Sequence, residues 1–226
     1  MARVYIPARS ADDWQSLLAE PELHWKTGRS ARSLAHCWAD ADEWPDSFGQ
    51  ALTEAGLDLE ILLAIPEHEV PLPGGSRPSQ TDLWVLARSR ADSSLASVAV
   101  EGKVSESFGP VVSDWLKDDQ GGKTERLRYL CQTLGVREPT AIGSLRYQLL
   151  HRTASAVIEA GRFGAARAMM VVHSFSDQQV GFPDYVAFAQ ELGAEPAVGS
   201  MSRARDLGGV ELWLGWVAGE PRYLTR

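Results

Sequence analysis

Glu101 and Lys103 place an acid and a base two residues apart within the apolar stretch VAVEGKV, residues 98–104. Side chains alternate between the two faces of a β-strand, so Ala99, Glu101 and Lys103 would share one face. We therefore expect one face of this strand to belong to the core and the other to carry chemistry. The alternative is an ordinary Glu–Lys pair on the solvated face of an edge strand, which would contribute little.

The preceding strand is expected to bring an aspartate to the same place. The polar run from Ser89 to Ser94 is a natural hairpin loop between two apolar strands. If this loop is symmetric about residues 91 and 92, Asp82 lies directly opposite Glu101. Two facing carboxylates repel and destabilise a sheet unless a cation lies between them. The hairpin therefore predicts a cation site.

A third acid is expected from the strand before that. A turn centred on residues 75 and 76, in the run PLPGGS, places Glu69 opposite Asp82, with Glu67 on the same face. Three neighbouring strands would then present carboxylates around one point. The identity of the acid on the first of these strands stays open between Glu60, Glu67 and Glu69.

Carboxylates without histidine or thiolate ligands favour a hard cation such as Mg²⁺ or Mn²⁺. Such an ion can position and deprotonate water, and it can neutralise charge on a phosphoryl oxygen. Lys103 would add a positive point charge near the nucleophile or the scissile phosphate. Only four of the 22 Lys and Arg residues are lysines, so a lysine at this position is notable.

The pattern of Asp82 followed on the next strand by Glu101-Gly102-Lys103 resembles the PD-(D/E)XK nuclease superfamily, which has the restriction-endonuclease-like fold. The resemblance implies that Asp82, Glu101, Gly102 and Glu69 hold Mg²⁺ or Mn²⁺. It also implies that Lys103 assists the attack of water on a phosphodiester of a nucleic acid.

The resemblance covers residues 45–217 in the order of elements, but only residues 82–103 in motif. Members often supply a further polar residue from the helix after the motif, and the candidate here is Gln148. Arg146 and Arg152 flank it and could touch phosphates. The residue before Asp82 is Thr81 rather than the proline of the motif, a departure that many members tolerate.

The hydrophobic pattern predicts an α/β fold with a mixed sheet, an antiparallel meander followed by crossover units, flanked by helices. Helices are expected over residues 10–45, after Pro45 and over 125–134, 145–160 and 185–192, and strands over 61–70, 81–88, 95–104, 166–173 and 210–217. We expect a single domain, residues 1–226, with an N-terminal helical segment (1–45) and a nuclease-like core (46–226).

The net charge of −8 means that no broad basic field surrounds the chain, so any nucleic-acid contact would be local. The densest basic cluster near the N-terminus is Lys26, Arg29 and Arg32, beside Trp25 and Trp38. This segment is either a nucleic-acid or partner surface, or a helix packed on the sheet with a charged outer face. Likewise, Glu106 either ends its strand or shapes one lip of the site.

Two functions follow from these patterns. The first is a cytoplasmic, metal-dependent nuclease that could form a homodimer. We expect no membrane segment, because no apolar run is long enough to span a bilayer. The second is a non-catalytic domain of the same fold that serves as a binding or interaction module, which the negative net charge favours.

Overall fold

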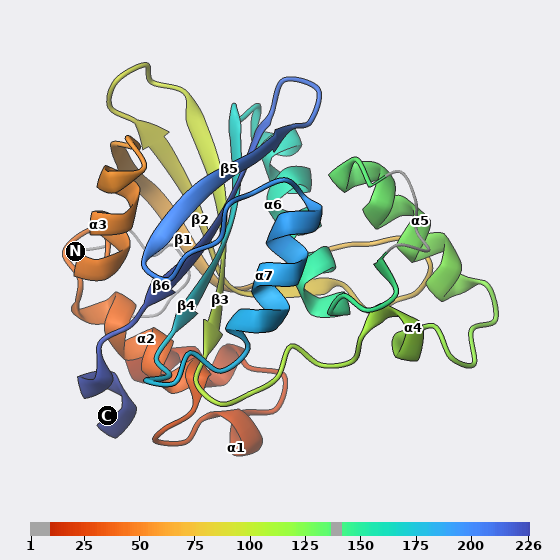
Figure 1. Ribbon diagram of the computed structural model, residues 1–226. Coiled ribbons are helices and arrows are strands. Elements are labelled where there is room, and N and C mark those ends of the chain that lie inside the picture. Colours follow the sequence, from red (N-terminus) through yellow and green to blue (C-terminus); the bar gives the residue numbers. More distant parts are fainter. Residues whose placement is uncertain (1–9, 137–141) are drawn as a thin grey trace.

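The computed structural model describes residues 10–136 and 142–226, so residues 1–9 of the expected N-terminal helical segment lie outside it. Six strands form one mixed sheet in the order β1-β2-β3-β4-β6-β5, with helices on both faces (Figure 1). The strands are β1 (Leu59–Val70), β2 (Ser79–Ser89), β3 (Leu95–Lys103), β4 (Arg167–Ser174), β5 (Ser200–Asp206) and β6 (Glu211–Ala218).

The helices follow the predicted order with small shifts of their ends. They are η1 (Ala11–Leu17), α1 (Pro21–His24), α2 (Ser30–Asp40), α3 (Asp46–Glu54), α4 (Val112–Trp115), α5 (Gly122–Leu134), α6 (Tyr147–Phe163), α7 (Phe182–Glu191) and η3 (Pro221–Thr225). The short α4 and η3 were not predicted. None of the helices in the described ranges is long and apolar enough to cross a membrane.

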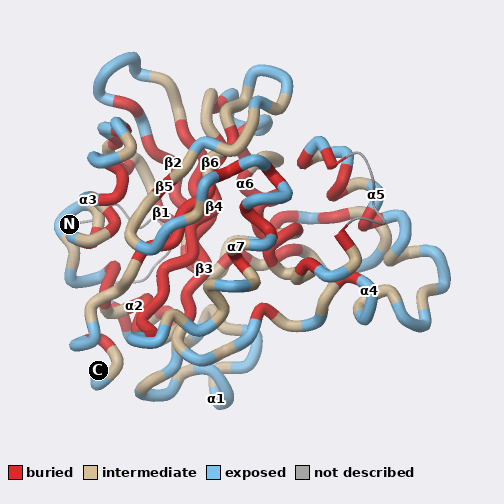
Figure 2. The backbone as a smooth tube through the Cα atoms, viewed as in Figure 1, coloured by how far each residue is buried: buried red, intermediate tan, exposed pale blue. Residues whose placement is uncertain are grey.

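The sheet separates two hydrophobic clusters. One lies between the sheet and α5, α6 and α7, and the other lies between the sheet and α2 and α3. Alternate residues of β4 enter different clusters: Met170 and Val172 pack under α6 and α7, whereas Met169 and Val171 face α2 and α3. The central strands are therefore buried on both faces (Figure 2), which explains why β4 is continuously apolar in sequence.

The predicted hairpin between β2 and β3 is confirmed. The two strands pair antiparallel with Leu83 opposite Val100 and Trp84 opposite Ala99. Continued by one residue, this register faces Asp82 toward Glu101. The sequence pattern was sufficient here because the loop is short and both strands are strongly apolar.

The second half of the sheet is built from crossovers. Strand β4 pairs parallel to β3 after the chain passes through α4, α5 and α6, and β6 pairs parallel to β4 after α7. Strand β5 is antiparallel to β6 at the sheet edge and was missed by the sequence pattern. Its residues, SMSRARD, are mostly polar, as expected for an edge strand with one exposed side.

Candidate active site

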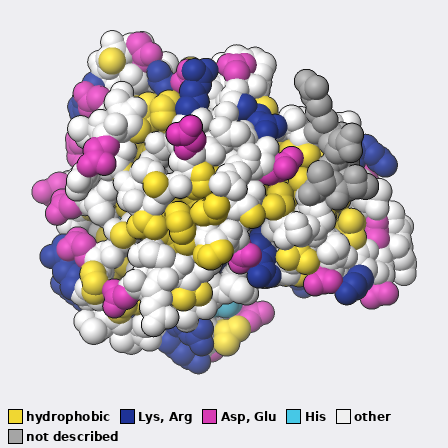
Figure 3. All heavy atoms as spheres, in the orientation of Figure 1, with side chains coloured by type: hydrophobic (Ala, Val, Ile, Leu, Met, Phe, Trp, Pro, Cys, Tyr) yellow, Lys and Arg dark blue, Asp and Glu magenta, His cyan; other side chains and the backbone are white. Residues whose placement is uncertain are grey.

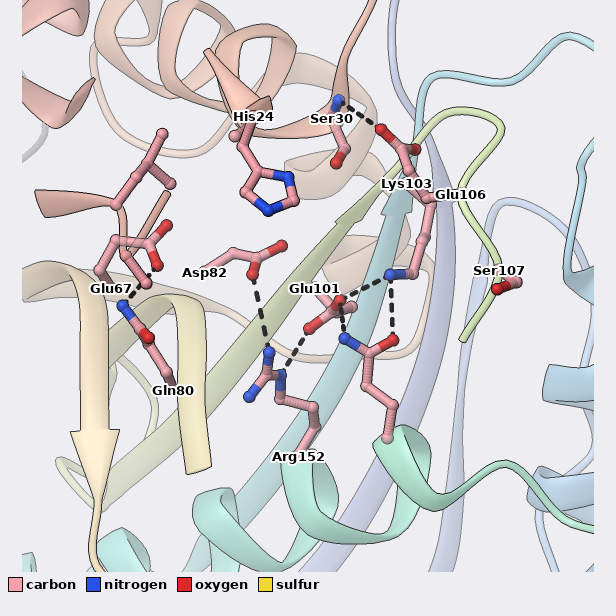
Figure 4. Close-up of a pocket in the computed structure, with 14 residues that line it drawn as sticks. His24, Ser30, Glu67, Gln80, Asp82, Glu101, Lys103, Glu106, Ser107 and Arg152 are labelled. Carbon is pink, nitrogen blue, oxygen red and sulfur yellow. Dashed lines mark hydrogen bonds and ion pairs between the residues drawn. The ribbon is translucent and has the colours of Figure 1, made fainter. Parts of the chain in front are cut away.

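A cavity of about 340 Å³ lies where β1, β2 and β3 meet α6 and the segment that contains α1 and the start of α2 (Figure 4). Its polar lining includes Glu67, Gln80, Asp82, Glu101, Lys103 and Arg152. Residues from separate strands and one helix thus converge on one point.

Strand β3 places Glu101 and Lys103 on the same side, as the alternation predicts. The Lys103 Nζ donates to Glu101 Oε1 at 2.8 Å, and the two residues are only 5% and 2% exposed. Because β3 is an inner strand covered by helices on both faces, the predicted chemical face is buried under α6. This arrangement also excludes the alternative of a solvated pair on an edge strand.

Helix α6 supplies the two side chains that complete the bonding of Glu101. Gln148 Nε2 donates to Glu101 Oε1 at 2.7 Å, and Lys103 Nζ donates to Gln148 Oε1 at 3.1 Å. Arg152, one helical turn later, donates from Nε to Glu101 Oε2 at 2.6 Å. The structure therefore brings Gln148 to the predicted place, and both oxygens of Glu101 accept hydrogen bonds.

Arg146 does not join this cluster. Its Nη1 donates to the carbonyl oxygen of Gly109 at 2.7 Å, and its Nε lies 3.0 Å from Asp184 Oδ2. Arg146 therefore does not line the cavity, and its contact with a phosphate stays a prediction. Arg146 is the N-cap residue of α6. From the start of that helix its side chain connects Gly109, in the loop after β3, with Asp184 of α7.

Asp82 lies beside Glu101, on the neighbouring strand. Its Oδ2 accepts a hydrogen bond from the backbone N–H of Gly102 at 2.8 Å, and its Oδ1 lies 3.9 Å from Arg152 Nη2. A side chain at position 102 would press on Leu34 of α2, since a Cβ at this position would lie 3.3 Å from the Leu34 Cδ2. Gly102 thus permits α2 to approach the strand next to the site.

The acid from β1 is Glu67, and the prediction of Glu69 opposite Asp82 is wrong. The observed register pairs Glu69 with Gln80, His68 with Thr81 and Pro66 with Leu83. The turn is thus centred between residues 74 and 75, one position earlier than predicted, and the pairing shifts by two residues. Glu69 is exposed.

Glu67 faces the cavity with an unusual backbone. Its φ is +51°, a left-handed conformation that non-glycine residues rarely adopt, and its Oε2 accepts from Gln80 Nε2 at 3.0 Å. Such strain, on the order of 1–3 kcal/mol, is concentrated at functional sites. Glu60, the remaining candidate, instead pairs with Arg88 and Arg90 near the other end of β1.

The three acids differ in their affinity for protons. Burial and the negative charge of Asp82 raise the pKa of Glu67 to about 9, and burial and the charge of Glu101 raise the pKa of Asp82 to about 7. Burial would also raise the pKa of Glu101, but the Lys103 and Arg152 charges outweigh it and lower that pKa to about 2. Near neutral pH the site thus holds an ionised Glu101, a protonated Glu67 and an Asp82 whose pKa lies close to the pH itself.

The donor chemistry fits a hard divalent cation, because the facing carboxylates supply oxygen ligands. The raised pKa values of Glu67 and Asp82 reflect a repulsion between carboxylates that such a cation would relieve. The side chains are not gathered as a ligand set, however. Within residues 10–136 and 142–226, no group of three or more His, Cys, Asp or Glu residues is placed to hold a metal ion. Metal binding would therefore require side chains around Glu101 to move.

The N-terminal segment forms one wall of the cavity, which the motif did not predict. His24 of α1 points toward Asp82, and Ser30 at the start of α2 lies beside it (Figure 4). The Ser30 backbone N–H donates to Glu106 Oε1 at 3.1 Å, while Glu106 Oε2 accepts from the Val104 N–H at 2.8 Å. Glu106 thus shapes the lip of the site by tying α2 to the end of β3. No spacing in the sequence marks His24.

The rest of this segment packs as a helix on the sheet. Leu34 and Trp38 of α2 are buried in the cluster under β3, whereas Lys26 and Arg29 are exposed. The structure thus bears out a helix packed on the sheet, and the exposed charges of Lys26 and Arg29 lie in the loop that precedes it. Lys and Arg side chains also gather at the end of the molecule where α1 lies (Figure 3).

Comparison with known proteins gives a family without an assigned activity. A family model described as a domain of unknown function (DUF6946) matches residues 7–221. No curated protein and no solved structure matches the chain.

Proposed function

We propose that this chain, which belongs to the DUF6946 family, is a metal-dependent phosphodiesterase of the PD-(D/E)XK type that acts on nucleic acid. The description of the family assigns no activity. The observation that carries the proposal is the convergence of Asp82, Glu101 and Lys103 on one cavity from two adjacent strands. The α/β architecture, with a three-strand antiparallel meander followed by a parallel strand, agrees with the restriction-endonuclease-like fold that this type implies.

Each side chain has a definable task in this proposal. Asp82 and Glu101, with the Gly102 carbonyl and Glu67, would hold Mg²⁺ or Mn²⁺, which when bound supplies charge neutralisation at phosphorus and acidifies water. Lys103 carries its charge into the cavity beside Glu101, where it stabilises negative charge that develops on a phosphoryl oxygen. Gln148 orients Lys103 and Glu101 by bonding to both.

A second function has two observations in its favour. Both oxygens of Glu101 are engaged by Lys103, Gln148 and Arg152, as in a purely structural polar network. A non-catalytic binding or interaction module would keep such a network and have no need of metal. The net charge of −8 also suits a partner other than nucleic acid.

Calorimetry with Mn²⁺ separates the two functions. We expect wild type to bind Mn²⁺ and to cleave at least one of duplex DNA, single-stranded DNA and RNA, and Asp82→Asn to lose both properties. Lys103→Met should retain Mn²⁺ binding and lose about 10²–10³-fold in kcat, the usual effect of removing one electrostatic stabiliser. Asp114→Asn, an exposed change on α4, is the control. Absence of Mn²⁺ binding by wild type and by every variant disproves the metal site and leaves the interaction module.

A further inference from the structure

Arg152 lies among the acids of the site and contacts two of them. Its Nε bonds to Glu101 Oε2 at 2.6 Å and its Nη2 lies 3.9 Å from Asp82 Oδ1 (Figure 4). Its Nη1 also donates to Ser79 Oγ at 3.4 Å. Within the described ranges, it is the one side chain that contacts both acids, because Lys103 pairs with Glu101 alone. Arg152 is 8% exposed and Glu101 2%, so little solvent screens the contact between these two residues.

The position of the guanidinium is the one that two facing carboxylates require. Buried acids on adjacent strands are unfavourable unless a positive charge lies between them. Arg152 supplies that charge from α6, on the side of the sheet that Glu101 faces. A guanidinium and a divalent cation placed between the same two carboxylates repel each other, so the two positive charges compete for this position.

We propose that Arg152 is an internal counter-charge that exchanges with the divalent cation. Without the cation it neutralises Glu101 and Asp82, and it withdraws from both when the cation binds. The withdrawn guanidinium, with its several N–H donors, then faces the cavity, where it can bond to a phosphate oxygen of the substrate. This inference rests on the proposed metal-dependent function, and it explains why the acids that bond to Arg152 are not gathered as ligands.

The exchange predicts that Arg152 competes with metal. If the state with Arg152 withdrawn is populated at about 10% or less, the apparent affinity for metal is reduced at least about tenfold. Arg152→Met removes the competitor while keeping an apolar stem of similar reach. We therefore expect Arg152→Met to bind Mn²⁺ about tenfold more tightly than wild type, and to be less stable than wild type in EDTA.

The control is Arg126→Met. Arg126 is also 8% exposed, but it bonds to the backbone carbonyl oxygens of Leu72, Pro73 and Gly75 and contacts no acid of the site. Its replacement should lower the melting temperature equally with and without Mn²⁺. For Arg152→Met, saturating Mn²⁺ should instead restore most of the melting temperature lost in EDTA, because the metal replaces the missing charge.

The measurements are calorimetry with MnCl₂ and thermal unfolding in EDTA or MnCl₂, on the full chain. Tighter Mn²⁺ binding by Arg152→Met supports the inference, and so does binding by this variant when wild type shows none. If wild type binds Mn²⁺ through Asp82 and Arg152→Met binds it no more tightly, the exchange is wrong and the metal site stands. If no variant binds Mn²⁺, both proposals fail. Should Arg152→Met not fold, Arg152→Gln, which retains polar bonding without charge, gives the same comparison.

Discussion

At the scale of single residues, the question is which glutamate of β1 belongs to the site. Glu67 faces Asp82 across the strand pair, whereas Glu69 is exposed and its Cα partner is Gln80. We expect Glu67→Gln to weaken Mn²⁺ binding at least about tenfold, because a carboxylate near the cation is lost. Glu69→Gln should bind Mn²⁺ like wild type. Titration of both variants in the same calorimeter checks this, and equal weakening by the two changes would contradict the assignment.

The sequence predicted the site on β2 and β3 but not its surroundings. Asp82, Glu101 and Lys103 follow from strand alternation and one short loop, and Gln148 follows from the family resemblance. Glu67 could not be chosen over Glu69, because the turn before β2 offers adjacent glycines and a shift of one position moves the pairing by two residues. Arg152 was expected to reach phosphate, and its ion pair with Glu101 depends on how closely α6 packs on the sheet.

At the scale of elements, the turn between β1 and β2 fixes which residues of β1 reach the site. Gly74 lies in this turn with φ +76°, and a Cβ there would lie 2.0 Å from the carbonyl oxygen of Gly122 at the start of α5. The side chain of Arg126 bonds to the same turn. Contact with α5 thus sets the register that sequence alone left ambiguous.

Gly74→Ala tests this contact. The change should destabilise the protein by the left-handed backbone penalty of about 1–2 kcal/mol and by an additional clash with Gly122. Gly56→Ala is the matched control, because Gly56 has φ +73° and nothing within 4 Å of its Cβ position. Urea unfolding should show a clearly larger loss for Gly74→Ala. Equal losses would mean that the turn does not depend on its close approach to α5.

The elements were largely predictable, and β5 and α4 are two exceptions that share a physical cause. Long apolar patterns gave α2, α3, α5, α6, α7 and five of the six strands. The strand β5 is polar because one edge of it faces solvent, and α4 is a single turn of four residues. Neither buries enough apolar surface to leave a periodic pattern.

At the scale of the whole molecule, the packing of α2 on the sheet is linked to stability through one buried histidine. The Trp38 Nε1–H of α2 donates to His173 Nδ1 of β4 at 3.2 Å, and His173 is fully buried. Burial lowers the pKa of His173 to about 3 from an ordinary value of 6.5. The unfolded chain therefore takes up this proton more readily than the folded one.

Acid should therefore destabilise the fold through His173. Its contribution to stability is present above pH 6.5 and is lost as the pH falls from 6.5 toward 3, with a slope of up to about 1.4 kcal/mol per pH unit. His173→Gln keeps an acceptor for Trp38 and does not titrate. Urea unfolding between pH 7 and pH 4 should show a shallower loss of stability for this variant than for wild type. Parallel curves would rule out His173 as the source.

The separation of Asp82, Glu101 and Arg152 along the chain also has a consequence in time. The β2–β3 hairpin closes a short loop and can form early, whereas Arg152 follows Glu101 by 51 residues and arrives only when α6 docks. If the hairpin forms first, the two acids meet before their arginine is present, and a proton or a cation from solution would have to neutralise them until α6 docks.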